Sequence, residues 1–155
     1  MLDGNLSVPG GFEAVWNRVS CSRDSCGDGG AAVLREFMLK AARACELYRS
    51  LSRKMPGCAR TLCRLADEER CRLRALSGEY YLLTGECFAP PPACPLACGC
   101  LSALREAYLA ETENAKAYRA AACSAEGDIA RLYERSAECE DCHAAALRGL
   151  ILRAI

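Results

Sequence analysis

Four long segments of the chain repeat apolar residues every three or four positions, which is the spacing of one face of an α-helix. These segments run from about Ala31 to Lys54, from Ala59 to Leu83, from Leu101 to just before Gly127, and from Asp128 to Arg153. They are rich in Ala, Leu, Arg and Glu, which all favour helix. No segment shows the alternating pattern of a strand. The pattern therefore predicts an all-α protein built from four helices.

The connections between the segments predict how the helices pair. A short turn at Pro56-Gly57 joins the first segment to the second, and a similar turn joins the third to the fourth, so each couple is expected to form an antiparallel hairpin. Between the couples lies GECFAPPPACPLACGC, residues 85–100, whose prolines favour an extended chain. At about 3.1 Å per residue, this segment is long enough to cross the bundle.

The two predicted hairpins also resemble each other in sequence. LREFMLKAARACELYR (34–49) aligns with LREAYLAETENAKAYR (104–119) at both ends and at a central leucine. ADEERCRLRAL (66–76) aligns with AECEDCHAAAL (137–147) at Ala, Glu, Cys, Ala and Leu. In both alignments the second segment follows the first by nearly the same number of residues along the chain. We therefore interpret the chain as a duplicated helical hairpin.

The first thirty residues follow a different pattern. FEAVWNRV (12–19) predicts a short amphipathic helix, and SCSRDSCGDGG (20–30) is typical of a flexible linker. We therefore expect residues 1–30 to form an N-terminal appendage and linker, and residues 31–155 to form the four-helix bundle.

The charge and composition of the chain indicate which partners and which cellular compartment to expect. Twenty basic and twenty acidic residues cancel, which gives no reason to expect nucleic acid or an anionic membrane as a partner. No apolar run is long enough to span a bilayer, and the N-terminus lacks the pattern of a signal peptide. We expect a cytoplasmic protein. Its thirteen cysteines, an odd number, are then expected to be reduced thiols.

Three glutamates and the single histidine lie on the apolar stripes, namely Glu69, Glu111, Glu140 and His143. A buried, unpaired carboxylate is costly, and several together repel one another. A cation, a basic side chain or shared protons must compensate for them. In four-helix bundles a known solution is a carboxylate-bridged metal pair, held by one Glu from each of two helices and a Glu-x-x-His from each of the other two. Oxygen and imidazole ligands suit iron or manganese.

With these motifs the chain resembles the ferritin-like superfamily, and its rubrerythrin branch in particular, over about residues 34–152. The resemblance rests on the duplicated hairpin, the long crossover, the spacing of Glu111 and Tyr118, and the Glu-x-x-His of Glu140 and His143. It implies a ferritin-like antiparallel four-helix bundle, made of two helical hairpins joined by a long crossover. It also implies a metal site in the core of that bundle.

The resemblance implies six metal ligands, and this chain keeps four of them. The four are Glu69, Glu111, Glu140 and His143. The histidine expected three residues after Glu69 is Arg72, and the glutamate expected seven residues before Tyr48 is Ala41. In the family these two positions serve mainly the same metal. We therefore expect a half-degenerate, redox-active site for one iron or manganese ion, with Arg72 reaching Glu69 or Glu140 in place of the second ion.

Other interpretations stay open at this point, including whether the protein is an enzyme. One alternative is a non-catalytic ferritin-like bundle with a structural or interaction role, in which Arg72 neutralises the carboxylates and no metal enters. Another is a thiol-based metal or redox protein that uses the crossover cysteines. These are Cys87, Cys94, Cys98 and Cys100, whose spacing differs from that of zinc-binding knuckles.

Three smaller expectations complete the interpretation. Helical cysteines off the apolar stripes, such as Cys139, are expected to be surface or packing thiols. The apolar tail LRGLILRAI (147–155) is a candidate surface for a homodimer. Rubrerythrins usually carry a rubredoxin-like domain for electron supply, and nothing in this sequence resembles one.

Overall fold

Four long helices make up the fold. The computed structural model describes residues 27–96 and 98–155. The helices are α2 (Gly27–Lys54), α3 (Ala59–Thr84), α4 (Cys100–Cys123) and α5 (Gly127–Ala154), with a short 3₁₀ helix, η1 (Pro56–Cys58), between α2 and α3. Within the described residues there is no strand, which confirms the prediction of an all-α protein with four helices. None of the described helices is long and apolar enough to cross a membrane.

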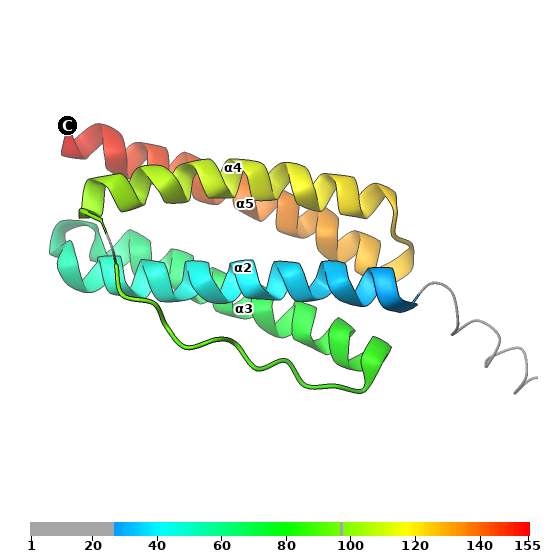
Figure 1. Cartoon of the computed structure of the whole chain (residues 1–155). Helices are drawn as coiled ribbons and strands as arrows, with labels where there is room; N and C mark the ends of the chain where they lie inside the picture. Colours follow the sequence, from blue (N-terminus) through cyan, green and yellow to red (C-terminus); the bar gives the residue numbers. More distant parts are fainter. Residues whose placement is uncertain (1–26, 97) are drawn as a thin grey trace, which may run out of the picture.

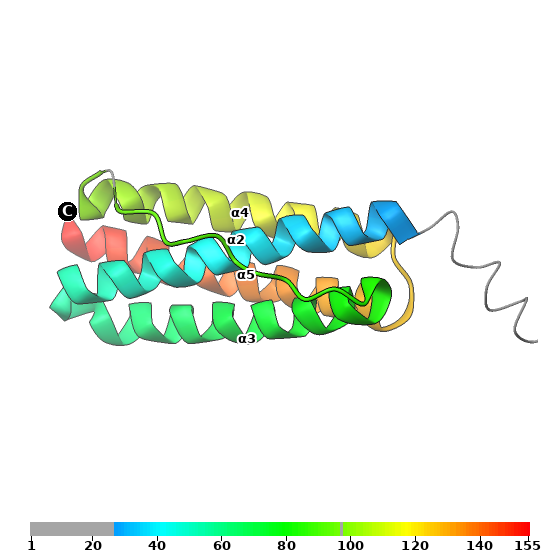
Figure 2. The ribbon, with the colours of Figure 1, turned by 60° about the horizontal axis from the view of Figure 1, so that its bottom comes forward.

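The helices associate in two couples. Helix α2 packs mainly against α3, and α4 packs mainly against α5. Each couple is joined by a short connection at one end and lies side by side from there (Figures 1 and 2). The chain from residue 85 to 96 runs along the outside of the bundle, from the end of α3 towards the opposite end, where α4 begins. This segment is the crossover that the prolines predict.

A local signal explains the end of α3, and the predicted start of α2 is wrong. Helix α3 ends at Gly85, whose backbone takes the left-handed conformation, with φ 74°, that favours glycine. Helix α2 begins at Gly27, about four residues before the predicted start, so residues 27–30 are helix rather than linker. A Cβ added at Gly30 would lie 3.7 Å from a Leu83 methyl, so this first turn packs beside α3. Packing of this kind offsets the low helix propensity of glycine. The predicted helix at 12–19 lies outside the described residues.

The core consists of two apolar clusters with a polar layer between them. One cluster includes Tyr48, Leu51, Leu62, Leu104 and Leu147. The other includes Leu34, Phe37, Leu76, Tyr118 and Tyr133. On each helix, the stripe positions between the two clusters are Ala41 on α2, Glu69 and Arg72 on α3, Glu111 on α4, and Glu140 and His143 on α5. The fold therefore gathers the polar stripe residues at the middle of the bundle.

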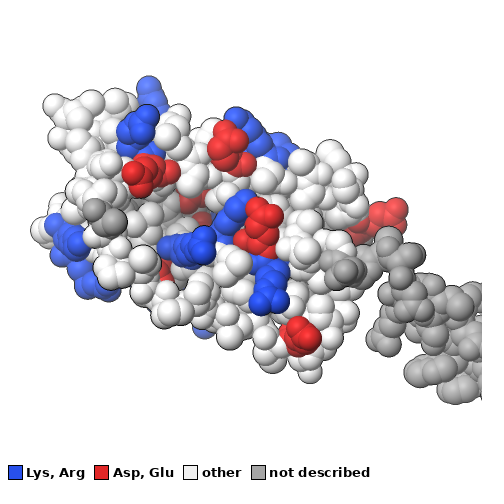
Figure 3. Space-filling model, in the orientation of Figure 1, with Lys and Arg blue, Asp and Glu red and all other residues white. Residues whose placement is uncertain are grey.

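Charged side chains of both signs share the outer surface. Figure 3 shows basic and acidic residues interspersed on the face it presents. Several of them pair within one helix, such as Lys40 with Glu36 at 2.6 Å and Lys116 with Glu113 at 2.7 Å. Exposed pairs of this kind contribute at most about 1 kcal/mol each to the stability of the fold.

Candidate metal centre

The four predicted site residues meet in the polar layer. Glu69, Glu111, Glu140 and His143 are each at most 2% exposed, and one potential ligand atom from each lies within 4.8 Å of those of the others. The residues come from α3, α4 and α5. The bundle therefore encloses a buried group of carboxylate and imidazole side chains that could hold a metal ion.

Arg72 makes the contacts that its position on the stripe predicts. Its Nη1 atom lies 2.7 Å from Glu69 Oε1 and 2.5 Å from Glu140 Oε1, and its side chain is 4% exposed. Burial alone would lower the pKa of the guanidinium, but the charge of Glu69 and the contributions of Tyr118 and Cys139 together outweigh burial and raise the pKa above its usual value. Arg72 is thus a fixed positive charge that bridges two of the carboxylates, which confirms its predicted role as a partner of Glu69 and Glu140.

Helix α2, which provides none of the four predicted ligands, contributes a hydroxyl group to the cluster. Tyr48, on α2, donates a hydrogen bond from its hydroxyl to Glu111 Oε1. Burial and the neighbouring negative charge of Glu111 raise the pKa of Tyr48, so the phenol keeps its proton and stays a donor. This contact holds Oε1 of Glu111, which also lies 3.8 Å from His143 Nδ1.

The protein groups leave the cluster short of positive charge and of hydrogen-bond partners. Three carboxylates face one guanidinium, which leaves two negative charges when His143 is neutral. Among the described residues, four buried side-chain atoms have no hydrogen-bond partner. They are Glu111 Oε2, Glu140 Oε2, His143 Nδ1 and Arg72 Nη2, although Nδ1 lies 3.0 Å from Glu69 Oε1. Unpartnered buried polar atoms are uncommon in folded proteins. Three of the four are carboxylate and imidazole atoms, which suit a divalent cation.

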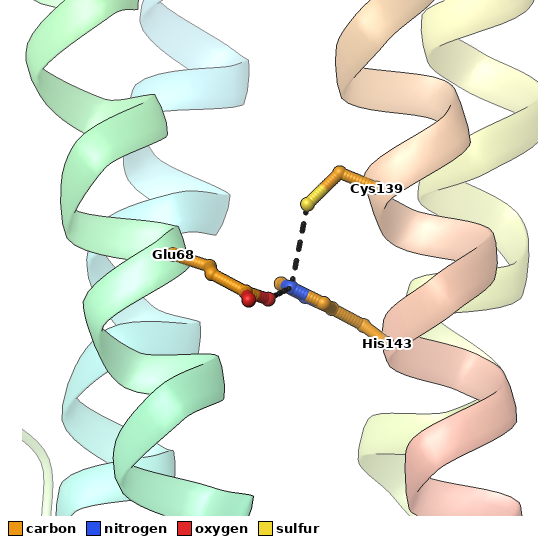
Figure 4. Close-up of side chains that lie close together, drawn as sticks. All are labelled: Glu68, Cys139 and His143. Atoms are coloured by element: carbon orange, nitrogen blue, oxygen red, sulfur yellow. Dashed lines mark hydrogen bonds and ion pairs between the residues drawn. The ribbon is translucent and has the colours of Figure 1, made fainter.

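The outer nitrogen of His143 faces a different set of groups. Nε2 lies 2.7 Å from Glu68 Oε2 and 3.4 Å from Cys139 Sγ, as Figure 4 shows. Burial alone would lower the pKa of His143. The contacts of its ring with Cys139, Glu111 and Glu69 together outweigh burial and raise the pKa to about 12. With Nε2–H held by Glu68, Nδ1 points into the cluster, in the manner of a carboxylate that orients a metal-binding histidine.

Glu68 and Cys139 are themselves affected by this contact. Burial raises the pKa of Glu68, but the stronger combined effect of hydrogen bonds from Arg64 and His143 lowers it. The hydrogen bond to His143 lowers the pKa of the Cys139 thiol, and the positive charge of Arg72 adds to this effect against the opposing effect of burial. Both side chains are thereby biased towards their negative forms.

Sequence reasoning missed Glu68 and Cys139 as parts of the site. Cys139 was expected to be a surface or packing thiol, yet it stands four residues before His143 and so shares a helix face with it. The spacing of four residues between Cys139 and His143 was therefore the feature of the sequence that could have identified Cys139 as a neighbour of the site. Glu68 gave no comparable signal, because it lies next to the stripe and its contact depends on how α3 is rotated against α5.

The crossover cysteines do not form a comparable group. Cys87, Cys94 and Cys98 are exposed, and Cys100 is half-buried. Within the described part of the chain, the groups of side chains close enough to hold a metal contain none of them. The eleven cysteines in that part are all free, whereas Cys21 and Cys26 lie outside it. The thiol-based alternative thus has no geometric support in the crossover.

Comparisons with protein-family models, with curated proteins and with solved structures found no match for this chain. The resemblance to ferritin-like proteins therefore depends on the sequence motifs, and the case for metal depends on the geometry of the cluster itself.

Proposed function

We propose that this protein is a ferritin-like, rubrerythrin-related antiparallel bundle that binds one iron or manganese ion per chain. The ligands are Glu69, Glu111, Glu140 and His143. The observation that carries the proposal is that three of the four buried atoms without a partner are potential metal ligands, namely Glu111 Oε2, Glu140 Oε2 and His143 Nδ1. They belong to three of the four residues that the sequence motifs select independently.

Charge balance supports one ion rather than two. With neutral His143, the three carboxylates and Arg72 together carry two negative charges, and one divalent cation cancels them. A second divalent ion would leave the buried cluster with two excess positive charges, which is costly in a low-dielectric interior. Arg72 also bridges Glu69 and Glu140, which would be the carboxylates shared by two ions in the family.

The proposed chemistry follows from a single ion. Bound iron or manganese supplies one-electron redox steps, whereas two-electron reduction of oxygen or peroxide is the work of a dinuclear site. The residues of this chain hold and orient the ligands. Tyr48 fixes Glu111, Arg72 fixes Glu140, and Glu68 holds the outer nitrogen of His143. We therefore propose metal binding with single-electron redox activity at most, rather than the reaction of a complete dinuclear centre.

Binding of Mn²⁺ is expected to release at least one proton per ion near neutral pH. His143 is protonated in the metal-free protein, because its pKa is raised to about 12, and a metal ligand must be neutral. Proton and cation compete for Nδ1, so affinity should rise about tenfold per pH unit through the neutral range, below that pKa. Calorimetric titration in buffers of different ionisation enthalpy measures the number of protons released.

Two glutamates on α4 supply the matched variants for this titration. Glu111→Gln removes a proposed ligand charge and should abolish tight Mn²⁺ binding. Glu113→Gln changes an exposed residue that pairs with Lys116, and it should bind as the wild type does. Equal Mn²⁺ binding by the two variants, or binding without proton release, contradicts the proposed site.

A further inference from the structure

A groove between α3 and α5 exposes a second set of metal-binding groups. The groove has a volume of about 670 Å³, and its lining includes Glu68, Arg72, Cys139, Cys63 and Cys71. Glu68 is 37% exposed at its side chain and Cys139 is half-buried, while His143 behind them is fully buried. Figure 4 shows Glu68 reaching from α3 and Cys139 from α5 to the same nitrogen of His143.

We propose that Glu68, Cys139 and Nε2 of His143 form a second metal site at the groove. This site binds Zn²⁺ or a similar thiophilic divalent cation, and it competes with the buried cluster for His143. This site goes beyond the proposed function, because its donor set includes a thiolate and faces solvent. Thiolate ligands favour zinc and other soft cations over manganese. The proposal stands on the convergence of three ligand types on one point.

The distances suit a small tetrahedral ion. Bond lengths of about 2.3 Å to sulfur and about 2.0–2.1 Å to nitrogen place these two ligand atoms about 3.6 Å apart in a tetrahedral zinc site. Cys139 Sγ and His143 Nε2 are 3.4 Å apart. Glu68 Oε2 and Nε2 are closer, at 2.7 Å, which is the distance of a hydrogen bond. Glu68 must therefore move outward by about half an ångström to coordinate, which its partial exposure allows.

Charge and accessibility also agree with this ion. On binding, the Cys139 thiol and Nε2–H give their protons to solvent, and their lone pairs bind the cation. The carboxylate and the thiolate then cancel the two positive charges of zinc. Three protein ligands leave a fourth position open, as in zinc sites that also bind water or a substrate.

The shared histidine makes the two sites alternatives. A neutral imidazole offers one nitrogen lone pair, because the other nitrogen carries the proton. An ion at Nδ1 needs Nε2–H pointing at Glu68, whereas an ion at Nε2 needs the remaining ring proton on Nδ1, which lies 3.0 Å from Glu69 Oε1. The chain is therefore expected to hold a hard cation in the buried cluster or a thiophilic cation on the groove, but not both together.

Alkylation of the cysteines with iodoacetamide, with and without one equivalent of Zn²⁺, tests the groove site. Mass spectrometry of peptides reports each cysteine separately. Zinc should slow the modification of Cys139 by about tenfold or more, because a metal-bound thiolate is a poor nucleophile. Cys63 and Cys71, which line the same groove outside the cluster, should react at unchanged rates.

Two conservative variants separate this site from the buried one. Glu68→Gln should lose the protection of Cys139, whereas Glu111→Gln should keep it while losing tight Mn²⁺ binding. The proposal is overturned if zinc leaves Cys139 as reactive as before in the wild type, or if it protects Cys94 and Cys98 instead. Protection that persists in Glu68→Gln, or that disappears in Glu111→Gln, also overturns it. Failure of the groove site with intact Mn²⁺ binding leaves the proposed function standing.

Discussion

Replacing Arg72 with methionine is expected to lower the free energy of unfolding of the metal-free protein by about 3–5 kcal/mol. The guanidinium bridges Glu69 and Glu140 in a site that is almost completely buried. Its removal leaves Glu140 without a positive partner and Glu69 with His143 alone, and breaking a buried ion pair from one side carries a penalty of this size. Urea denaturation followed by circular dichroism, in the presence of a chelator, measures the change.

A neighbouring arginine provides the control for this result. Arg70→Met breaks an exposed pair with Asp67 on the same helix, and it should change the free energy of unfolding by less than about 1 kcal/mol. Saturating divalent metal should restore part of the stability of Arg72→Met, by about 2.7 kcal/mol at a concentration one hundred times Kd. Wild-type stability of Arg72→Met in chelator would show that Arg72 does not compensate the buried carboxylates.

The double variant Ala41→Glu/Arg72→His is expected to bind two divalent ions per chain. Ala41 lies in the polar layer and is 3% exposed, at the stripe position where the resemblance implies a glutamate. The two substitutions add one negative charge and remove one positive charge. The cluster then carries four carboxylates, whose charge two divalent ions cancel. Metal analysis after dialysis against buffer without metal measures the stoichiometry.

The single variant Ala41→Glu tests whether an added carboxylate ligand is enough to bind a second ion while Arg72 keeps its positive charge. It adds a carboxylate but keeps Arg72, so it should hold one ion and lose stability in chelator, because the added charge has no partner. A folded double variant that still holds one ion would contradict the view that Arg72 stands in the place of a second metal.

The sequence predicts the polar layer well because helical periodicity alone determines it. Glu69, Glu111, Glu140 and His143 each occupy a stripe position, and a bundle must turn its stripes inward. The same rule explains why Arg72 meets the carboxylates. By contrast, Glu68 and Cys139 lie beside the stripes, at the edge of the interface between α3 and α5. Whether such residues touch depends on the rotation and separation of two helices, which periodicity does not specify.

The early start of α2 has a similar explanation. Glycine has low helix propensity, so the run of residues 27–30 favours a linker when it is considered alone. In the folded chain this turn continues a helix whose next residues, such as Leu34, are fully buried. Most of the stability of a helix in a protein comes from such packing, so the local prediction of a linker fails there.

Metal content per chain tests the central claim most directly. Elemental analysis of protein purified without oxygen should find about one iron or manganese ion in the wild type and none in Glu140→Ala/His143→Ala, with circular dichroism confirming that both are helical. This result would establish that the chain binds one metal ion at the site that contains Glu140 and His143. The absence of metal from a folded wild type, even after exposure to excess Fe²⁺ or Mn²⁺, would contradict the account and leave Arg72, with protonated His143, to balance the carboxylates of a bundle without metal.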